Sequence, residues 1–291
     1  MRYGKVIVAL FAAAMLLIGY LCVTRFMTST AQSSIVESTT QQETLQLTVG
    51  VSRNEYGFSD VAFLGGNKVW AVGYDGHDPQ RMYYSEDAGL NWKAKAILTG
   101  GFTLTGITFV TAQEGWAVGN NGTIVHTRNG GETWEQIKRP TESDLNEVQF
   151  ATSQVGYIAG MTEWGYEILR TVDGGQNWQK VYEELKGGYV FQIALHGEKI
   201  AVAAINDDHL VRTEDGGVTW RPVDISLPGA ASVVFTSDGT GWLVGRKGSF
   251  YRSTDQGRTW QIPDNLPQSL LSHNWSSIDF SDEKKRHGSR H

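Results

Sequence analysis

Short apolar runs alternate with Gly-, Asn- and Asp-rich breaks along most of the chain. Residues 115–134, GWAVGNNGTIVHTRNGGETW, show the pattern clearly: one run ends at Gly-Asn-Asn-Gly, a second ends at Asn-Gly-Gly, and Trp134 follows. Aromatic and β-branched residues favour strands, and Gly and Asn favour the tight turns between them. The stretch therefore predicts two strands and the start of a third.

The end of this stretch recurs at a regular period. Its copies are SEDAGLNW (85–92), TRNGGETW (127–134), TVDGGQNW (171–178), TEDGGVTW (213–220) and STDQGRTW (253–260). Their last residues, separated by 42, 44, 42 and 40 positions, are Trp92, Trp134, Trp178, Trp220 and Trp260. Runs similar to GWAVG, and before them runs similar to TGITFV, precede each copy. Four strands in about 42 residues match the size of one β-propeller blade.

The repeated eight residues, called the box below, predict a structural turn. Ser or Thr ends the third strand, and the Asp or Asn two positions later accepts hydrogen bonds from backbone N–H groups of the turn. Gly supplies the positive φ that reverses the chain, and Trp starts the fourth strand and packs over the turn. The residues at the acidic position are Asp87, Asn129, Asp173, Asp215 and Asp255. Asn129 is expected to form the same turn as the aspartates.

We therefore predict an all-β propeller with five complete four-stranded blades and a partial sixth. The sixth starts at residues 274–282, and no GWAVG-like strand follows it. Residues 44–51 could supply the outer strand of a blade whose inner strand is 276–280. A small or incompletely closed ring and a shortened chain both fit this pattern. The expected domains are 1–27 (signal anchor or signal peptide), 28–46 (flexible polar linker), 47–282 (propeller) and 283–291 (charged tail).

An uncharged apolar run, residues 6–23, follows Arg2 and Lys5 and predicts a hydrophobic N-terminal helix. Its length lies between that of a signal-peptide core and that of a membrane-spanning helix. Ser29–Ala31 suit cleavage, whereas the long run and Arg25 favour an uncleaved anchor, the interpretation that we slightly prefer. In both cases the positive charge before the run directs the rest of the chain outward. We expect an exported propeller, anchored in the membrane through residues 6–23 or secreted.

Composition narrows the function classes. The net charge of −6 argues against a nucleic-acid partner. The single cysteine, Cys22, lies in the apolar run, and neither G-x-S-x-G nor a P-loop is present. A loose set of loop residues fits no tight metal-binding motif: His77, Asp78, Asp207, Asp208 and His209. No catalytic residue, cofactor or metal is predicted.

The box resembles the Asp-box, or bacterial neuraminidase repeat, of sialidases, sortilins and other propellers. The longer unit, GWAVGNNGTIVHTRNGGETW, is similar to the repeat of the photosystem II stability and assembly factor family, and this resemblance spans about residues 53–260. Members of that family are exported propellers that chaperone a photosystem subunit. The resemblance implies a non-catalytic scaffold in photosynthesis that binds a protein partner, namely a membrane protein or its assembly intermediate.

A row of cationic side chains is one candidate for partner binding. Arg170, Arg212 and Arg252 directly precede the box in three successive units. The row indicates either a cationic patch for an acidic or carbonyl-rich partner or long side chains that pack between blades. The boxes are expected on one face of the ring, and the second-to-third and fourth-to-first connections on the other.

An insertion supplies the other candidates. Glu163, Trp164 and Tyr166 lie in a predicted second-to-third loop, where Trp164 is either a partner contact or packs against its own blade. Tyr166 and Trp164 would stack on sugars if the protein were a polysaccharide-binding module. A sialidase-like glycosidase is a further alternative, but the Arg-Ile-Pro motif that this resemblance implies is absent. Paired catalytic carboxylates on different blades would leave no sequence motif.

Overall fold

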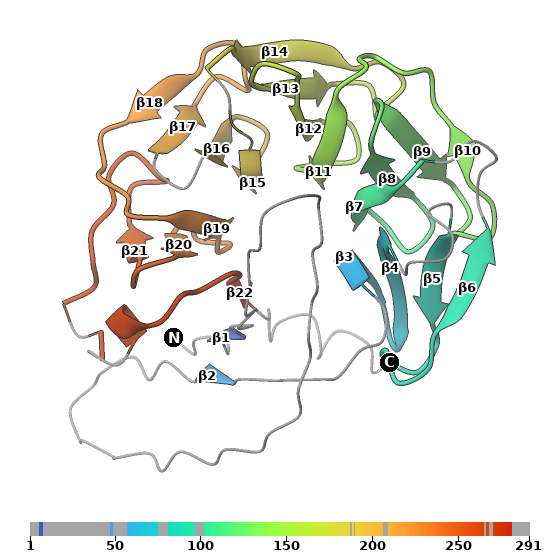
Figure 1. The fold of residues 1–291 in the computed structure, drawn as a ribbon, viewed down its shortest axis with the longest axis horizontal. Coiled ribbons are helices and arrows are strands. Elements are labelled where there is room, and N and C mark those ends of the chain that lie inside the picture. Colours follow the sequence, from blue (N-terminus) through green and yellow to red (C-terminus); the bar gives the residue numbers. More distant parts are fainter. Residues whose placement is uncertain are drawn as a thin grey trace.

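The computed structural model shows β-sheets arranged as a ring around a central axis (Figure 1). It describes residues 6–7, 47–48, 57–74, 81–96, 102–186, 188, 190–205, 209–264, 266–267 and 270–280. Five of the sheets consist of consecutive strands, which is the arrangement of propeller blades. The predicted all-β propeller is confirmed.

The strand boundaries follow the sequence repeat. Blade 1 consists of β3 (Gly57–Gly65), β4 (Lys68–Tyr74), β5 (Arg81–Ser85) and β6 (Lys93–Ala96). Blade 2 consists of β7 (Leu104–Phe109), β8 (Gly115–Gly119), β9 (Thr123–Thr127) and β10 (Glu135–Gln136). Blade 3 consists of β11 (Asp144–Phe150), β12 (Gly156–Met161), β13 (Tyr166–Thr171) and β14 (Gln179–Glu184).

The outer strand is short in blade 4 and is reduced to a single bridge in blade 5. Blade 4 consists of β15 (Val190–His196), β16 (Ile200–Ile205), β17 (His209–Thr213) and β18 (Arg221–Val223). Blade 5 consists of β19 (Ala230–Phe235), β20 (Gly241–Gly245) and β21 (Phe250–Ser253). Its fourth position holds a single bridge between Arg252 and Gln261.

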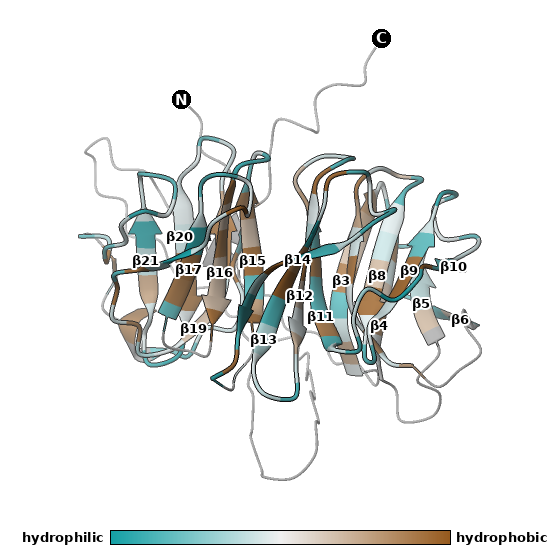
Figure 2. Ribbon diagram, turned by 90° about the horizontal axis from the view of Figure 1, so that it is seen from above, coloured by the Kyte–Doolittle hydropathy of each residue, from teal (hydrophilic) through white to brown (hydrophobic). Residues whose placement is uncertain are grey.

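Hydrogen bonds between loops show which connections share a face. The amide of Gly130, in a box, donates to Gln113 O in a first-to-second turn at 2.8 Å. The amide of Gly122, in a second-to-third turn, donates to Ser143 O in a fourth-to-first connection at 2.7 Å. Figure 2 shows the strands spanning the distance between the two rims of loops. We call the rim with the boxes the box face and the other rim the opposite face.

The hydrophobic core lies between the blades. Ile107 and Phe109, on the innermost strand of blade 2, pack against Trp70, Val72 and Met82 of blade 1. Alternate residues of a strand point to opposite sides of its sheet, so each blade buries one side against each neighbour.

The sixth sheet joins both ends of the described chain. It contains β2 (Leu47–Thr48), β1 (Val6–Ile7) and β22 (Asp279–Phe280), and a short 3₁₀ turn, η1 (Leu270–Ser272), precedes β22. As the sequence suggested, residues from 44–51 and 276–280 share a sheet, but β1 lies between them.

The strand β1 departs from the predicted N-terminal helix at the two positions that are described. Val and Ile are β-branched and favour the extended conformation, and β22 offers an unpaired edge. The other residues of 1–27 lie outside the described part of the chain, as do most of 28–46 and all of 283–291. Among the described residues, no helix has the length and apolar character that crossing a membrane requires.

Candidate functional site

Each box is a turn held by its own side chains, and the box of blade 4 is representative. The hydroxyl of Thr213 accepts the N–H of Gly217 at 2.8 Å and donates to Asp215 Oδ1 at 2.8 Å. Asp215 Oδ1 also accepts the N–H of Thr219 at 2.9 Å, and Oδ2 accepts its hydroxyl at 2.6 Å. These bonds from Thr219 and Thr213 lower the pKa of Asp215 to about 2.

The other boxes repeat this geometry. The side-chain Oδ1 of Asn129 accepts the N–H of Thr133 at 2.9 Å, so the amide makes the turn that the aspartates make elsewhere. Equivalent bonds are formed by Asp87, Asp173 and Asp255. Box tryptophans also link neighbouring blades: Trp178 meets Trp116 of blade 2 and Phe150 of blade 3 edge-on, with ring centroids 6.3 and 5.8 Å away.

Side chains directly before the boxes stack on aromatic rings of the second strand in the same blade. The Arg170 guanidinium lies 5.8 Å from the Tyr157 ring, and that of Arg252 lies 5.3 Å from the Trp242 ring. In blade 2 the position is held by His126, whose ring lies 3.7 Å from that of Trp116 and nearly parallel to it, at 7°. Desolvation lowers the pKa of this buried histidine. The row therefore takes part in packing within and between blades.

Arg212 also connects two blades. Its Nε donates to Gln256 O in the next box at 3.0 Å, and its Nη1 lies 2.8 Å from Glu214 Oε2. Arg258 of blade 5 reaches the same Glu214 oxygen at 2.9 Å. Hydrogen bonds from these two guanidinium groups lower the pKa of Glu214. The third nitrogen of Arg212, Nη2, is buried and has no hydrogen-bond partner among the described residues.

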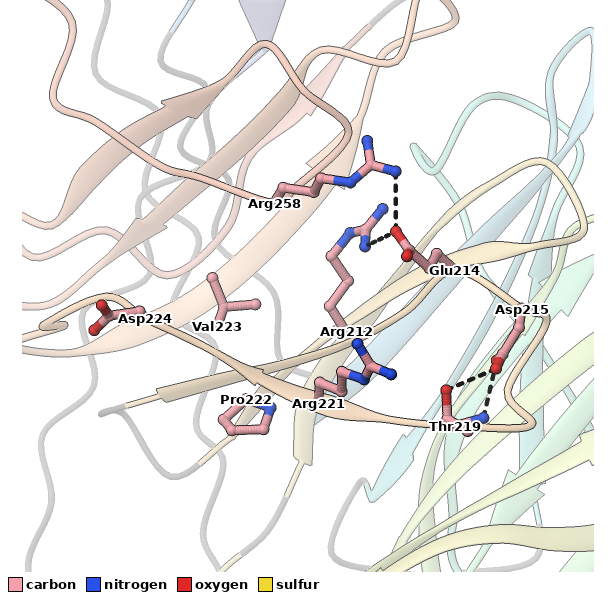
Figure 3. Close-up of a pocket in the computed structure, with 9 residues that line it drawn as sticks. All are labelled: Arg212, Glu214, Asp215, Thr219, Arg221, Pro222, Val223, Asp224 and Arg258. Atoms are coloured by element: carbon pink, nitrogen blue, oxygen red, sulfur yellow. Dashed lines mark hydrogen bonds and ion pairs between the residues drawn. The ribbon is translucent and has the colours of Figure 1, made fainter.

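A cavity of about 490 Å³ lies beside this network on the box face (Figure 3). Its lining comprises Arg212, Glu214, Asp215, Thr219, Arg221, Pro222, Val223, Asp224 and Arg258. Glu214 is already bound by two arginines, and Asp215 is held by Thr219. Figure 3 places Arg221 below Arg212, so that a further guanidinium borders the cavity. Such an arrangement can donate hydrogen bonds to carboxylate or carbonyl oxygens of a ligand.

The insertion in blade 3 lies on the opposite face, so the structure does not bring the predicted candidates together. Trp164 is 68% exposed in the turn between β12 and β13, and Glu163 is exposed beside it. The prediction that Tyr166 is a surface contact is wrong. Tyr166 begins β13, its side chain is buried, and its hydroxyl donates to Glu184 at 2.5 Å.

Two carboxylates inside the ring were missed by the sequence analysis. Asp60 of β3 and Glu147 of β11 follow bulges at equivalent positions of the innermost strands. Burial raises the pKa of Asp60 to about 6, and burial together with the Asp60 charge raises that of Glu147 to about 8. An alignment of the five innermost strands could have identified Asp60 and Glu147. The equivalent residues of the other blades are uncharged: Gly106, Gln192 and Ser232.

No group of three or more His, Cys, Asp or Glu side chains able to hold a metal occurs in the described part of the chain. Of the loop residues considered for metal binding, only His209 falls within it, and the other four lie outside.

Comparison with known proteins supports the resemblance drawn from the repeats. A photosystem II assembly lipoprotein Ycf48 from Synechococcus sp. (strain CC9902) is 29% identical over 186 residues, which cover 62% of this chain and 55% of that protein. The chain thus spans about half the length of the curated relatives that it matches.

Solved structures with the same fold include "YCF48 bound to D1 peptide", at 22% identity and a TM-score of 0.55 over 70% of this chain and 66% of that one. An ancestral GH74 enzyme aligns with a TM-score of 0.55 at 14% identity, over 70% of this chain and 30% of the enzyme. These two likenesses show the fold alone. The sequence profile of the photosynthesis system II assembly factor YCF48 family matches residues 24–127, 96–226 and 130–263. The chain therefore belongs to the photosynthesis system II assembly factor YCF48 family.

Proposed function

We propose that the chain is a non-catalytic, extracytoplasmic scaffold that binds a segment of a photosystem II membrane protein during assembly. Its family membership supports this proposal, and its relatives are named as assembly factors from cyanobacteria and from the rice chloroplast. A structural neighbour is named as bound to a D1 peptide, so a propeller of this kind accepts a peptide of a photosystem protein. The positive charge before the apolar run at residues 6–23 supports export of the propeller.

We assign the binding site to the cavity between blades 4 and 5. The observation that carries this assignment is the lining of the cavity, to which Arg212, Arg221 and Arg258 all contribute. Guanidinium groups donate charge-assisted hydrogen bonds to ligand oxygens that enter such a cavity. Peptide carbonyl groups and acidic side chains carry such oxygens. Trp164, on the opposite face, would serve a second contact of the same partner.

The test is binding of the full chain in detergent to immobilised peptides that tile D1. We expect at least one peptide to bind, and Arg212→Gln to weaken that binding by about tenfold or more. Arg128→Gln is the matched control, because Arg128 belongs to the box of blade 2 and its side chain is 64% exposed. Melting temperatures of both variants show whether the fold is kept. If the chain binds no D1 peptide, the proposed function is contradicted. If Arg212→Gln binds as tightly as the wild type, the assignment of the binding site to the cavity is contradicted.

The carboxylate pair provides the one observation that favours the glycosidase alternative. Carboxyl groups of raised pKa serve as general acids in such enzymes. However, Asp60 already accepts the backbone N–H of Ile107, which gives it a role in joining two blades. We therefore expect no release of reducing sugar from xyloglucan and no cleavage of sialosides, and either activity would support the enzyme.

A further inference from the structure

One pair of ionisable side chains distinguishes blade 2 from the other blades. His126, directly before the box, has its Nε2 3.3 Å from Oε1 of Glu114, which ends the turn between β7 and β8. The strand registers give the residues equivalent to His126 as Tyr84, Arg170, Arg212 and Arg252, and those equivalent to Glu114 as Lys68, Val155, Ile200 and Thr240. Of the five blades, blade 2 alone therefore places a histidine at this position opposite a carboxylate.

The imidazole of His126 is enclosed at the junction between blades 2 and 3. Its side chain is 1% exposed and stacks on the Trp116 ring. That ring also stacks on Phe150 of blade 3, with ring centroids 5.6 Å apart. Gly175, in the box of blade 3, meets the same indole, since a Cβ added to it would lie 2.5 Å from Trp116 Cη2. The packing of the blade 3 box therefore depends on the position of the Trp116 ring, which His126 supports.

The enclosed ring favours its neutral form. Glu114 lies close enough to pair with a protonated Nε2, but Nδ1 has no hydrogen-bond partner within the described part of the chain. A protonated imidazole carries two N–H donors and a charge, and burying it without an acceptor for each donor is unfavourable. Burial, followed by the Arg128 charge, accordingly lowers the pKa of His126, and the Glu114 and Glu135 charges oppose this effect.

Space for a displaced imidazole lies beside the stack. A cavity of about 190 Å³ on the box face is lined by His126, Arg128, Asn129, Thr133 and Glu135. Glu135 of β10 is the register partner of His126, and its Oε2 lies 3.3 Å from Arg128 Nη1. The cavity thus offers a protonated ring a more polar surrounding and a second carboxylate.

We infer that His126 is a proton-sensitive joint between blades 2 and 3, which releases Trp116 when its imidazole takes up a proton and so loosens the box of blade 3. Arginine and tyrosine, which hold the equivalent positions, keep one charge state between about pH 5 and about pH 8 and do not supply this response. The joint is separate from the cavity at Arg212 and does not depend on the proposed function.

The sign of the response follows from the lowered pKa of His126. An unfolded chain binds this proton with the ordinary histidine pKa of about 6.5 and therefore more tightly than the folded chain does. The contribution of the neutral ring is complete above about pH 6.5 and is lost as pH falls through the lower folded-state value. Glu147 acts in the opposite direction over the same pH range, so the test requires a local measurement.

Hydrogen exchange of the full chain in detergent, measured by mass spectrometry, provides this local measurement. The reporter is the box of blade 3, where the N–H of Gly175 donates to Thr171 Oγ1 at 2.9 Å. The internal control is the box of blade 4, where the N–H of Gly217 makes the same bond to Thr213 at 2.8 Å. Both boxes share one sample, so the ratio of their rates cancels the pH dependence of the chemical step. We expect the ratio of blade 3 to blade 4 to rise by about threefold or more from about pH 7.5 to about pH 5.

Substitutions taken from the other blades test the residue. His126→Arg introduces the residue of blades 3 to 5 and should abolish the rise in the ratio. His126→Tyr introduces the residue of blade 1 and should do the same if the arginine variant fails to fold, which a melting curve checks. His196→Gln is the matched control and should leave the rise unchanged, because that histidine lies near Phe235 of blade 5, with ring centroids 5.9 Å apart.

The pKa of His126 supplies a readout that a purely structural role would not move. NMR measures it from the ring resonances, which are assigned by their loss in His126→Arg. We expect a pKa below about 6.5, and Glu114→Gln should lower it further because an opposing negative charge is removed. A constant exchange ratio in the wild type, or a rise that persists in the folded His126 variants, overturns the inference. A pKa of His126 that Glu114→Gln leaves unchanged also overturns it.

Discussion

The carboxylate of Asp60 in blade 1 accepts the backbone N–H of Ile107 in blade 2 through Oδ2 at 2.8 Å. Gln192 and Ser232 make the corresponding bonds to blade 5 and to the segment before β22. A polar side chain after a bulge thus joins an innermost strand to the next. Only blades 1 and 3 place a carboxylate at this position within the described chain.

Removal of the Asp60 side chain is expected to loosen the first junction. Asp60→Ala leaves the buried N–H of Ile107 unpaired, which costs about 1–3 kcal/mol of unfolding free energy. Asp60→Asn keeps one of the two acceptor oxygens and removes a charge whose burial is unfavourable, so at about pH 8 it should lose less stability than Asp60→Ala. Urea denaturation of the full chain in detergent measures both. An equal loss of unfolding free energy in the two variants would show that the charge of Asp60, and not its acceptor oxygen, stabilises the junction.

Glu147 should make the propeller less stable as pH rises. Its folded-state pKa is raised from 4.5 to about 8, so the folded state binds its proton more tightly than the unfolded state does. The stabilisation is complete below about pH 4.5 and is lost as pH rises through about pH 8. Each pKa unit corresponds to about 1.4 kcal/mol. We expect the melting temperature to fall between about pH 5 and about pH 8, and Glu147→Gln to flatten this dependence. If the melting temperature of Glu147→Gln fell with pH as steeply as that of the wild type, the assignment of this pH dependence to Glu147 would be contradicted.

The hydroxyl of Thr213 should matter more than that of Thr219, although both bind Asp215. Thr213 is buried, and its oxygen accepts the N–H of Gly217 at 2.8 Å. Thr213→Val leaves that N–H unpaired and is expected to cost about 1–3 kcal/mol. Thr219 is exposed, so Thr219→Val should change stability by no more than about 0.5 kcal/mol. Chemical denaturation of the two variants provides the comparison, and a smaller loss for Thr213→Val would refute it.

The repeat made the fold predictable from sequence. The spacing of Trp92 to Trp260 fixes the blade length, and the Ser/Thr, Asp and Gly of each box encode a local turn that needs no distant partner. The substitution at Asn129 was interpretable because the chemistry of the turn depends on one oxygen, which Asn retains. Local patterns of this kind can be interpreted without knowledge of the tertiary structure.

The candidate sites were less predictable because they depend on which blades meet. Tyr166 was placed in a loop, yet β13 starts at this residue and turns its side chain inward. The sequence shows Arg212 as one of three equivalent arginines, whereas only the structure shows the unpaired Nη2 and the neighbouring Arg258. Val61 and Phe63 match the other first strands in sequence, whereas the structure shows that they are 43% and 69% exposed.

Glu214 offers a gain-of-binding test of the cavity. Its Oε2 accepts Arg212 at 2.8 Å and Arg258 at 2.9 Å, so it competes with any acidic ligand for both guanidinium groups. Glu214→Gln should strengthen binding of an acidic D1 peptide by about two- to fivefold and steepen its dependence on salt, because exposed charges contribute about 0.2–1 kcal/mol each. The binding assay at low and high salt measures both effects.

The control for this test is Glu86→Gln. Glu86 holds the equivalent box position in blade 1, where it pairs with Lys93 at 2.7 Å, and its change should not affect binding. Weaker binding by Glu214→Gln would contradict the competition and show that Glu214 positions the two arginines for the ligand. Stronger binding by both variants would mean that net charge alone attracts the peptide, whereas an effect confined to Glu214 supports recognition in the cavity between blades 4 and 5.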